Sequence, residues 1–205
     1  MNYQQLLKSL MAIAILFFAQ VNGWAQSNGA AELPASNEDV VLRWNRVLMQ
    51  TVLTPGQQPP TIMPVRSYAM MHAAMFDAVN SIDGTYTPYL TDVPGSQHAS
   101  IEAAAAQAAR DVLAALYPTR VAVFNAELAI SLQGIEENRA QQGIRVGQIV
   151  AERMLAARAN DGWNVTPPAY SLPATPGNWQ PAPGLAAFTH YPSVMPFGIT
   201  SGPQF

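Results

Sequence analysis

The chain has 205 residues, a formal net charge of −3 and no cysteine. Without cysteine it can be neither a lipoprotein anchored through that residue nor a small disulfide-stapled secreted module, so its stability must come from packing. Lys8 is the only lysine, and nine arginines are scattered among thirteen carboxylates. No basic stripe therefore exists that would bind nucleic acid or an anionic membrane surface.

Residues 1–25 are typical of a secretory signal peptide. Lys8 precedes an apolar run at 10–19. The small residues Gly23 and Ala25 lie just before the expected cleavage site, where signal peptidase recognises small side chains. A membrane-spanning helix is the alternative, but the run is about half of the ~20 residues that a bilayer requires, and no second apolar segment follows. We therefore expect a mature protein without a membrane segment, exported to the periplasm or the extracellular space.

Five helices are predicted over residues 36–162, after a flexible leader at 26–35. Ser36-Asn-Glu-Asp39 reads as a capping box that opens the first helix. Pro64 can open the second because proline is tolerated in the first helical turn, and Asp83-Gly84 ends it. In chain order the expected helices are Ser36–Val52, Pro64–Asp83, Gln97–Tyr117, Val121–Gly134 and Glu136–Ala159.

The last three helices rest on composition and periodicity. The third is rich in alanine, a strong helix former whose small side chain permits close helix packing. The fourth should end at Gly134 in a left-handed cap, and Asn160-Asp-Gly162 should terminate the fifth. On the fifth helix the expected inward residues are Ile144, Gly147, Val150, Ala151, Met154 and Leu155. Short loops between the helices predict an all-α helical bundle.

The composition changes after Gly162. Residues 167–205 contain nine prolines and no charged side chain, so an extended Pro-rich tail over 163–205 is expected to lie against a protein surface. Its rings could form a stacking platform for sugars or bases, but burial against the helices is the preferred interpretation. These rings belong to Trp163, Trp179, Phe188, Tyr191 and Phe197. The chain does not end like a finished domain, and we expect the domain to be incomplete.

An arginine, a histidine, a carboxylate and an amide stand inside the largely apolar second helix, namely Arg66, His72, Asp77 and Asn80. Arg66 and Asp77 are three turns apart, about 16 Å along the axis, so they cannot touch. Buried polar groups need partners whether or not they react, and the preferred interpretation is a structural helix whose polar groups bind neighbouring helices or loop backbone. The alternative is an active site.

The histidines do not indicate a metal centre. His72, His98 and His190 have no second histidine at helical spacing. His98 and Glu102 could share a ligand on one helix face, but a solvent-facing pair is preferred because metal sites need more ligands. We therefore assign no catalytic, cofactor-binding or metal-binding residue, and expect no cofactor in this chain.

Five short motifs occur in a distinctive order. They are Arg-x-x-Ala-Met-x-His-Ala-Ala-Met-x-Asp-Ala-Val-Asn at 66–80, Ala-Ala-Leu-Tyr-Pro at 114–118, Gly-x-x-Val-Gly-x-x-Val-Ala at 143–151, Ala-Arg-x-x-Asp-Gly-Trp at 157–163 and Pro-Gly-Asn-Trp-Gln-Pro at 176–181. Together they resemble the N-terminal half of bacterial vanadium-dependent haloperoxidase-like proteins. That group belongs to the type 2 phosphatidic acid phosphatase superfamily, and the resemblance covers nearly all of the expected mature chain.

The resemblance implies an α-helical enzyme that holds a phosphate-shaped oxyanion with lysine, arginines, serine and backbone amides, beside histidines. With vanadate bound, such enzymes activate peroxide and oxidise a halide. With a phosphate ester, a histidine attacks phosphorus and hydrolysis follows. The family's pocket comes from a lysine, an Arg-Pro, a Pro-Ser-Gly-His and a Ser-Arg with a further histidine, all of them in its C-terminal half.

This chain lacks the residues that form the catalytic pocket in that family. The expected mature part has no lysine, no Arg-Pro and no Ser-Gly-His; Pro192-Ser-Val-Met is the nearest string. The first hypothesis is therefore an inactive helical N-terminal portion, whose partner is the missing C-terminal catalytic half. The alternative is a non-catalytic scaffold that docks onto a partner through its uncharged tail. A second copy of the chain is a further candidate partner.

Overall fold

The computed structural model describes residues 38–57, 62–94, 96–182, 186–202 and 204. The predicted signal peptide and leader, and Ser36 of the predicted capping box, lie outside these residues. Residues 38 and 39 are not helical and the first described helix begins at Val40, so the predicted start of that helix at Ser36 is wrong. Contacts divide the chain into two units, Met1–Asp39 and Val40–Phe205. All of the described helices belong to the second unit.

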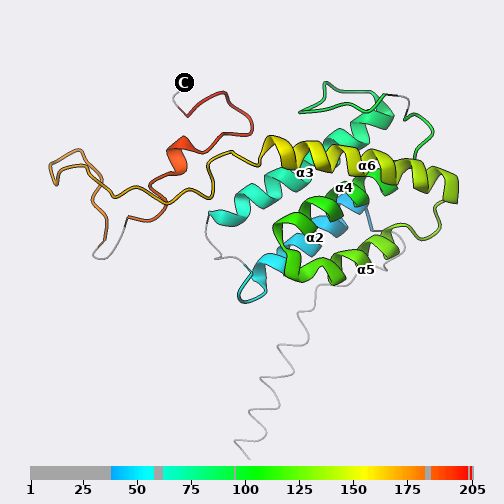
Figure 1. Ribbon diagram of the computed structural model, residues 1–205, viewed down its shortest axis with the longest axis horizontal. Helices are drawn as coiled ribbons and strands as arrows, with labels where there is room; N and C mark the ends of the chain where they lie inside the picture. Colours follow the sequence, from blue (N-terminus) through cyan, green and yellow to red (C-terminus); the bar gives the residue numbers. More distant parts are fainter. Residues whose placement is uncertain (1–37, 58–61, 95, 183–185, 203, 205) are drawn as a thin grey trace, which may run out of the picture. The chain divides into compact units, whose positions relative to one another are not determined.

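The described residues form five α-helices and no strand, which confirms the predicted all-α fold (Figure 1). The helices are α2 (Val40–Leu53), α3 (Met63–Asp83), α4 (Ile101–Leu116), α5 (Val121–Ser131) and α6 (Glu137–Ala157). Single 3-10 turns occur at Pro118–Arg120 and Tyr191–Ser193. None of the described helices is both long and apolar enough to cross a membrane.

Local capping chemistry explains where the helices begin and end. Gly84 adopts φ +68° and ends α3 as predicted. The Ser100 hydroxyl accepts from the Ala103 N–H, so α4 begins later than expected. The Glu136 carboxylate accepts from two backbone N–H groups at the start of α6. Helix α5 ends at Ser131, three residues before Gly134, which was predicted to end it. Gly134 does adopt the left-handed conformation, but it lies in the turn that follows the helix.

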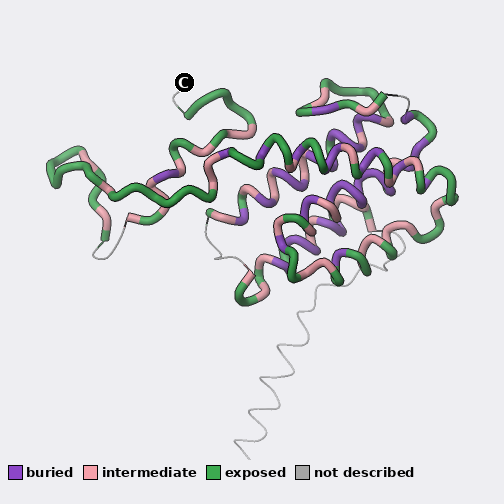
Figure 2. The backbone as a smooth tube through the Cα atoms, viewed as in Figure 1, coloured by how far each residue is buried: buried purple, intermediate pink, exposed green. Residues whose placement is uncertain are grey.

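Helix α4 lies at the centre of the bundle, because it contacts each of the other four described helices. Most of its residues are buried, as its colour in Figure 2 shows. Helix α6 approaches it through two glycines. A Cβ added to Gly143 would lie 2.5 Å from the Ser100 carbonyl oxygen, and one added to Gly147 would lie 2.5 Å from that of Ala104. The two backbones are therefore in direct contact.

This close approach changes the predicted inward face of α6. Ile144 and Leu155, which the apolar spacing placed inward, are only half-buried, whereas Val146 is buried. The glycine row determines which side of the helix meets α4, because only residues without a side chain fit between the two backbones. The buried residues of α6 are Ala140, Gly143, Val146, Gly147, Val150, Ala151 and Met154.

The described part of the tail contains no α-helix and is largely exposed (Figure 2). Trp179 is 60% exposed and meets Tyr170 edge-on, so the preferred expectation that the tail rings are buried against the helices is wrong for Trp179. Phe197 is half-buried beside Arg158. Phe188 and Tyr191 pack edge-on against each other. Proline removes backbone donors along this segment, and the described helical structure in it is limited to the 3-10 turn at Tyr191–Ser193.

Candidate functional site

The densest polar cluster lies where α3 begins, α6 ends and the tail returns. Arg66 Nε donates to Asp161 Oδ2 at 2.7 Å, and Arg66 Nη2 donates to the Arg158 carbonyl at 2.8 Å. The guanidinium of Arg66 also lies 4.9 Å from the centroid of the Trp163 ring. The Asp161 side chain is fully buried, so this is a desolvated ion pair whose charges are mutually compensated.

Arg158 is the second cation of the cluster and is 4% exposed. Its Nη1 donates to the Met195 carbonyl at 2.9 Å, and its Nη2 donates to the Pro196 carbonyl at 3.0 Å and to the Tyr89 hydroxyl at 2.7 Å. Its guanidinium stacks 3.6 Å from the centroid of the Phe197 ring. Arg158 therefore holds the returning tail against the end of α6, and both of its Nη atoms are hydrogen-bonded.

Asp77 is fully buried and binds backbone rather than another side chain. Its Oδ1 accepts from the Tyr89 N–H at 2.7 Å, and its Oδ2 accepts from the N–H groups of Leu90 at 2.9 Å and Thr91 at 3.0 Å. Three converging donors satisfy the carboxylate. Asp77 thus holds the loop after α3 in place, and both of its carboxylate oxygens are occupied by backbone hydrogen bonds.

Asn80 and His72 complete the polar set of α3. The Asn80 amide donates to the Tyr86 carbonyl at 2.6 Å and accepts from the Tyr86 N–H at 2.7 Å. His72 Nε2 lies 3.1 Å from Asn45 Oδ1 on α2, and burial lowers the pKa of the imidazole. Asn45 does not titrate, so this pair lacks the orienting carboxylate that a catalytic histidine commonly has.

The four polar residues of α3 therefore do not converge on one point. Arg66 reaches the end of α6, His72 reaches α2, and Asp77 and Asn80 bind the loop that follows α3. Each binds a neighbouring helix or loop backbone, which is the arrangement expected of a structural helix.

His98 and Glu102 do not share a helix face. His98 lies in the exposed turn before α4, whereas Glu102 is in the first turn and accepts from the Ser100 hydroxyl at 2.8 Å. Among the described residues, no group of three histidine, cysteine, aspartate or glutamate side chains could hold a metal ion.

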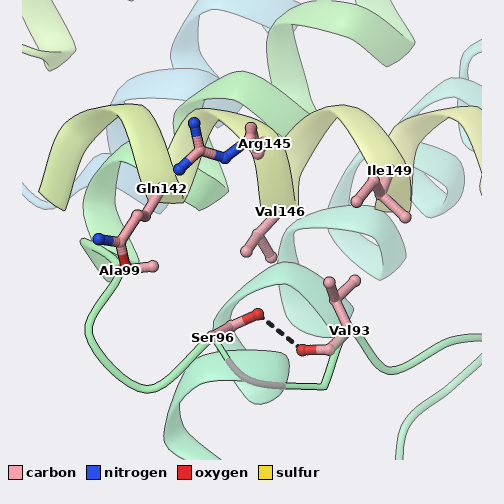
Figure 3. A pocket seen from close by; sticks show the side chains of 7 residues that line it. All are labelled: Val93, Ser96, Ala99, Gln142, Arg145, Val146 and Ile149. Atoms are coloured by element: carbon pink, nitrogen blue, oxygen red, sulfur yellow. Dashed lines mark hydrogen bonds between the residues drawn. The ribbon is translucent and has the colours of Figure 1, made fainter. Parts of the chain in front are cut away.

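A pocket of about 280 Å³ lies between α6 and the loop that precedes α4 (Figure 3). Its lining residues are Val93, Ser96, Ala99, Gln142, Arg145, Val146 and Ile149. The Ser96 hydroxyl already donates to the Val93 carbonyl at 2.6 Å, as Figure 3 shows. Arg145 is the single charged residue of the lining. A highly charged oxyanion needs several cations and amides, so this pocket does not fit vanadate.

Three further arginines, Arg43, Arg110 and Arg153, form contacts at separate places in the described part of the chain. Arg43 pairs with Glu127 at 3.4 Å, and Arg110 pairs with Asp111 at 2.7 Å. Arg153 donates to the Asp92 carbonyl at 3.2 Å. The pocket lining holds one cation, and Arg66 and Arg158 bind carboxylate and carbonyl groups of the fold, so these residues do not fit the oxyanion group that the family resemblance implies.

Sequence reasoning missed the partners of Arg66. Arg158 and Asp161 both lie in the motif at 157–163, and Arg66 lies in the motif at 66–80. A contact between these two motifs is the prediction that would have identified the partners of Arg66. Tyr89 carried no signal, because it lies in an irregular loop. The sequence identified His190 only as a histidine without a second histidine nearby and did not indicate its burial. In the structure it is buried with Nε2 3.0 Å from the Trp163 carbonyl, while its Nδ1 has no hydrogen-bond partner among the described residues.

In comparisons with known proteins, no protein-family model, no curated protein and no solved structure matches the chain.

Proposed function

We propose that this chain is the helical N-terminal portion of an exported vanadium-dependent haloperoxidase-like or acid phosphatase-like enzyme. In this role the chain supplies a scaffold, and a complementary C-terminal half supplies the oxyanion pocket. The observation that carries the proposal is the order of the five motifs, four of which lie on elements that contact one another in pairs. Arg66 of the first motif binds Arg158 and Asp161 of the fourth.

The second and third motifs belong to helices that are also in contact. The motif with Gly143 and Gly147 lies on α6 and packs on the alanine-rich helix α4, which ends in the second motif. Contacts of this kind hold the helices in fixed positions, which is the role of a scaffold. In an enzyme of this kind, bound vanadate would supply the centre that activates peroxide, and the residues described here would position helices around it.

The decisive test is the nucleotide sequence beyond codon 205. We expect an in-frame continuation that encodes a lysine, an Arg-Pro and a Ser-Gly-His, because these supply the cations, the hydroxyl and the histidine for a bound oxyanion. A stop codon directly after codon 205 would contradict the proposal.

Activity of the purified chain provides a second test. With vanadate, peroxide and bromide it should not brominate a phenolic dye, and it should not release phosphate from an aryl phosphate. Vanadate-dependent turnover by pure chain would show that the oxyanion site lies within these 205 residues.

Export is tested separately. The protein recovered outside the cytoplasm should begin at Gln26, because Gly23 and Ala25 form the proposed cleavage site. An intact N-terminus on the exported protein would contradict this part of the proposal.

A second candidate function is a non-catalytic scaffold that docks through its tail. The exposure of the tail favours it, since Trp179 is 60%, Leu172 55% and Met195 50% exposed. Exposed apolar residues on an uncharged segment indicate a contact surface. The downstream nucleotide sequence separates the two candidates, because only the first requires a catalytic continuation.

A further inference from the structure

The pocket between α6 and the loop before α4 contains an arginine that the fold does not use. Arg145 is exposed, and within the described ranges its guanidinium forms no hydrogen bond and no ion pair. Arg43, Arg66 and Arg110, by contrast, each pair with a carboxylate. A guanidinium presents its N–H donors in a planar fork that matches a carboxylate. Arg145 can therefore bind an anion without breaking a contact of the described fold.

Helix α6 contributes one face to this pocket, and the polarity of that face changes along the helix axis. Gln142, Arg145, Val146 and Ile149 follow one another at the spacing of a single helix face, over about 10 Å. Figure 3 shows Gln142 and Arg145 toward one end of the pocket and Ile149 toward the other. Gln142 uses one amide N–H for Asn138 at 3.3 Å and keeps the other. A ligand along this face would meet donors at one end and apolar side chains at the other.

The opposite wall of the pocket is mainly apolar. It comes from Val93, Ser96 and Ala99 of the loop before α4. The Ser96 hydroxyl donates to the Val93 carbonyl and so adds no free donor. The described lining includes no carboxylate that would compete for Arg145. Apolar walls with a few convergent polar groups are the usual composition of a small-molecule site, where burial of apolar ligand surface provides affinity.

The volume and the charge of the pocket restrict the ligand. The pocket measures about 280 Å³. An apolar cavity of about 150 Å³ accepts a benzene ring, so this pocket has room for one ring or a short branched chain together with a head group. Arg145 is the single cation of the described lining, which matches one negative charge. A phosphate dianion would need further cations.

We propose that this pocket binds a small monocarboxylate whose apolar body is about the size of one ring. The guanidinium of Arg145 pairs with the carboxylate, the free amide N–H of Gln142 donates beside it, and the body lies against Val146 and Ile149. The inference does not depend on the proposed enzymatic parent. For a ligand of about ten non-hydrogen atoms we expect a dissociation constant of about 1 mM.

Titration of the purified chain with phenylacetate tests the proposal. Two-dimensional NMR of the backbone amides should show saturable shifts confined to residues 93–99 and 142–149. Phenylacetamide has the same shape without the charge, and acetate has the charge without the ring, so each should bind at least about tenfold more weakly. Equal binding of phenylacetate and phenylacetamide, equal binding of phenylacetate and acetate, or no saturable shift at about 10 mM phenylacetate would overturn the proposal.

Substitution of Arg145 tests the residue that anchors the carboxylate. Arg145→Gln should weaken phenylacetate binding at least about tenfold, and Arg145→Lys should weaken it less, because lysine keeps the charge but not the planar fork. The matched control is Arg139→Gln, which removes the same charge from an exposed position of α6 outside the described lining and should change the affinity less than about twofold.

Circular dichroism melts of these variants should match that of the parent chain, because Arg145 has no side-chain hydrogen bond or ion pair within the described ranges to lose. Unchanged affinity of Arg145→Gln, or equal weakening by Arg145→Gln and Arg139→Gln, would show that Arg145 does not hold the carboxylate.

Discussion

At the scale of single residues, polar side chains of α3 stabilise the fold by hydrogen bonds to the backbone of the loop that follows the helix. Asp77 binds three backbone N–H groups of residues 89–91 and is fully buried, which leaves it no oxygen for chemistry. Asn80 binds both backbone groups of Tyr86 in the same loop. The loop after α3 therefore owes its shape to two side chains of the helix.

Replacing Asp77 by asparagine should destabilise the fold by at least about 1–3 kcal/mol. The amide NH2 would face one of the backbone donors and leave it without an acceptor. Urea unfolding would measure the change in the free energy of unfolding. The control is Asp83→Asn at an exposed position, where we expect a change within about 0.5 kcal/mol. Equal effects of the two variants would contradict this role of Asp77.

His72 should make stability depend on pH. Burial lowers the pKa of His72, so below its ordinary pKa of about 6.5 the unfolded chain binds more protons than the folded chain. This contribution is fully present above pH ~6.5, is lost as the pH falls through that value, and levels off below the folded pKa.

The measurement is the melting temperature between pH 7.5 and pH 5. His72→Gln removes the titrating group but keeps a hydrogen-bond donor for Asn45, so its melting temperature should fall less than that of the parent. Parallel pH profiles for the two proteins would refute the role assigned to His72.

At the scale of elements, the contact between α4 and α6 determines the packing of the bundle. Small residues on both helices bring the backbones together, and Gly143 and Gly147 supply the gaps on α6. Packing at this distance gains dispersion contacts along both helices but tolerates no added atom.

Gly147→Ala tests that contact. In an exposed helix this change would stabilise by about 1 kcal/mol, since alanine is the better helix former. Here the new Cβ would lie 2.5 Å from the Ala104 carbonyl oxygen and 2.8 Å from the Ala108 nitrogen, so we expect a net loss of about 1–3 kcal/mol. Arg145→Ala, at an exposed position of the same helix, is the control. A gain in stability from Gly147→Ala would disprove the backbone contact.

At the scale of the whole molecule, one buried cation connects the tail to the helices. Arg158 binds the carbonyls of Met195 and Pro196 and stacks on Phe197, while the Met195 N–H donates to the Asp161 carbonyl at 2.9 Å. The segment between residues 163 and 194 is thus fastened at both ends, although most of its described part is exposed.

Arg158→Ala should release the end of the tail while the helices remain folded. The expected result is several-fold faster chymotrypsin cleavage after Phe197, because local opening of the tail would no longer break bonds to Arg158. Arg153→Ala, which loses contacts with the loop residues Thr91 and Asp92, is the matched control. Unchanged cleavage of the Arg158 variant would show that other contacts hold the tail.

The sequence by itself determined the helices and most of their ends. Apolar spacing, Pro64 and Gly84 act within one or two turns of the chain, and such local signals are readable without tertiary structure. The predicted start of α4 is wrong because Ser100 is the cap, and several residues before it are equally compatible with a helix. The motif resemblance remains a prediction.

Only the tertiary structure decided which polar residues meet. Arg66 and Asp161 are 95 positions apart, and no spacing rule connects residues so distant. The exposure of Trp179 could not be predicted for the same reason, since burial of a ring depends on what surface lies beside it. Sequence periodicity specifies which face of a helix is apolar, whereas the partner of that face is specified by packing across the whole bundle.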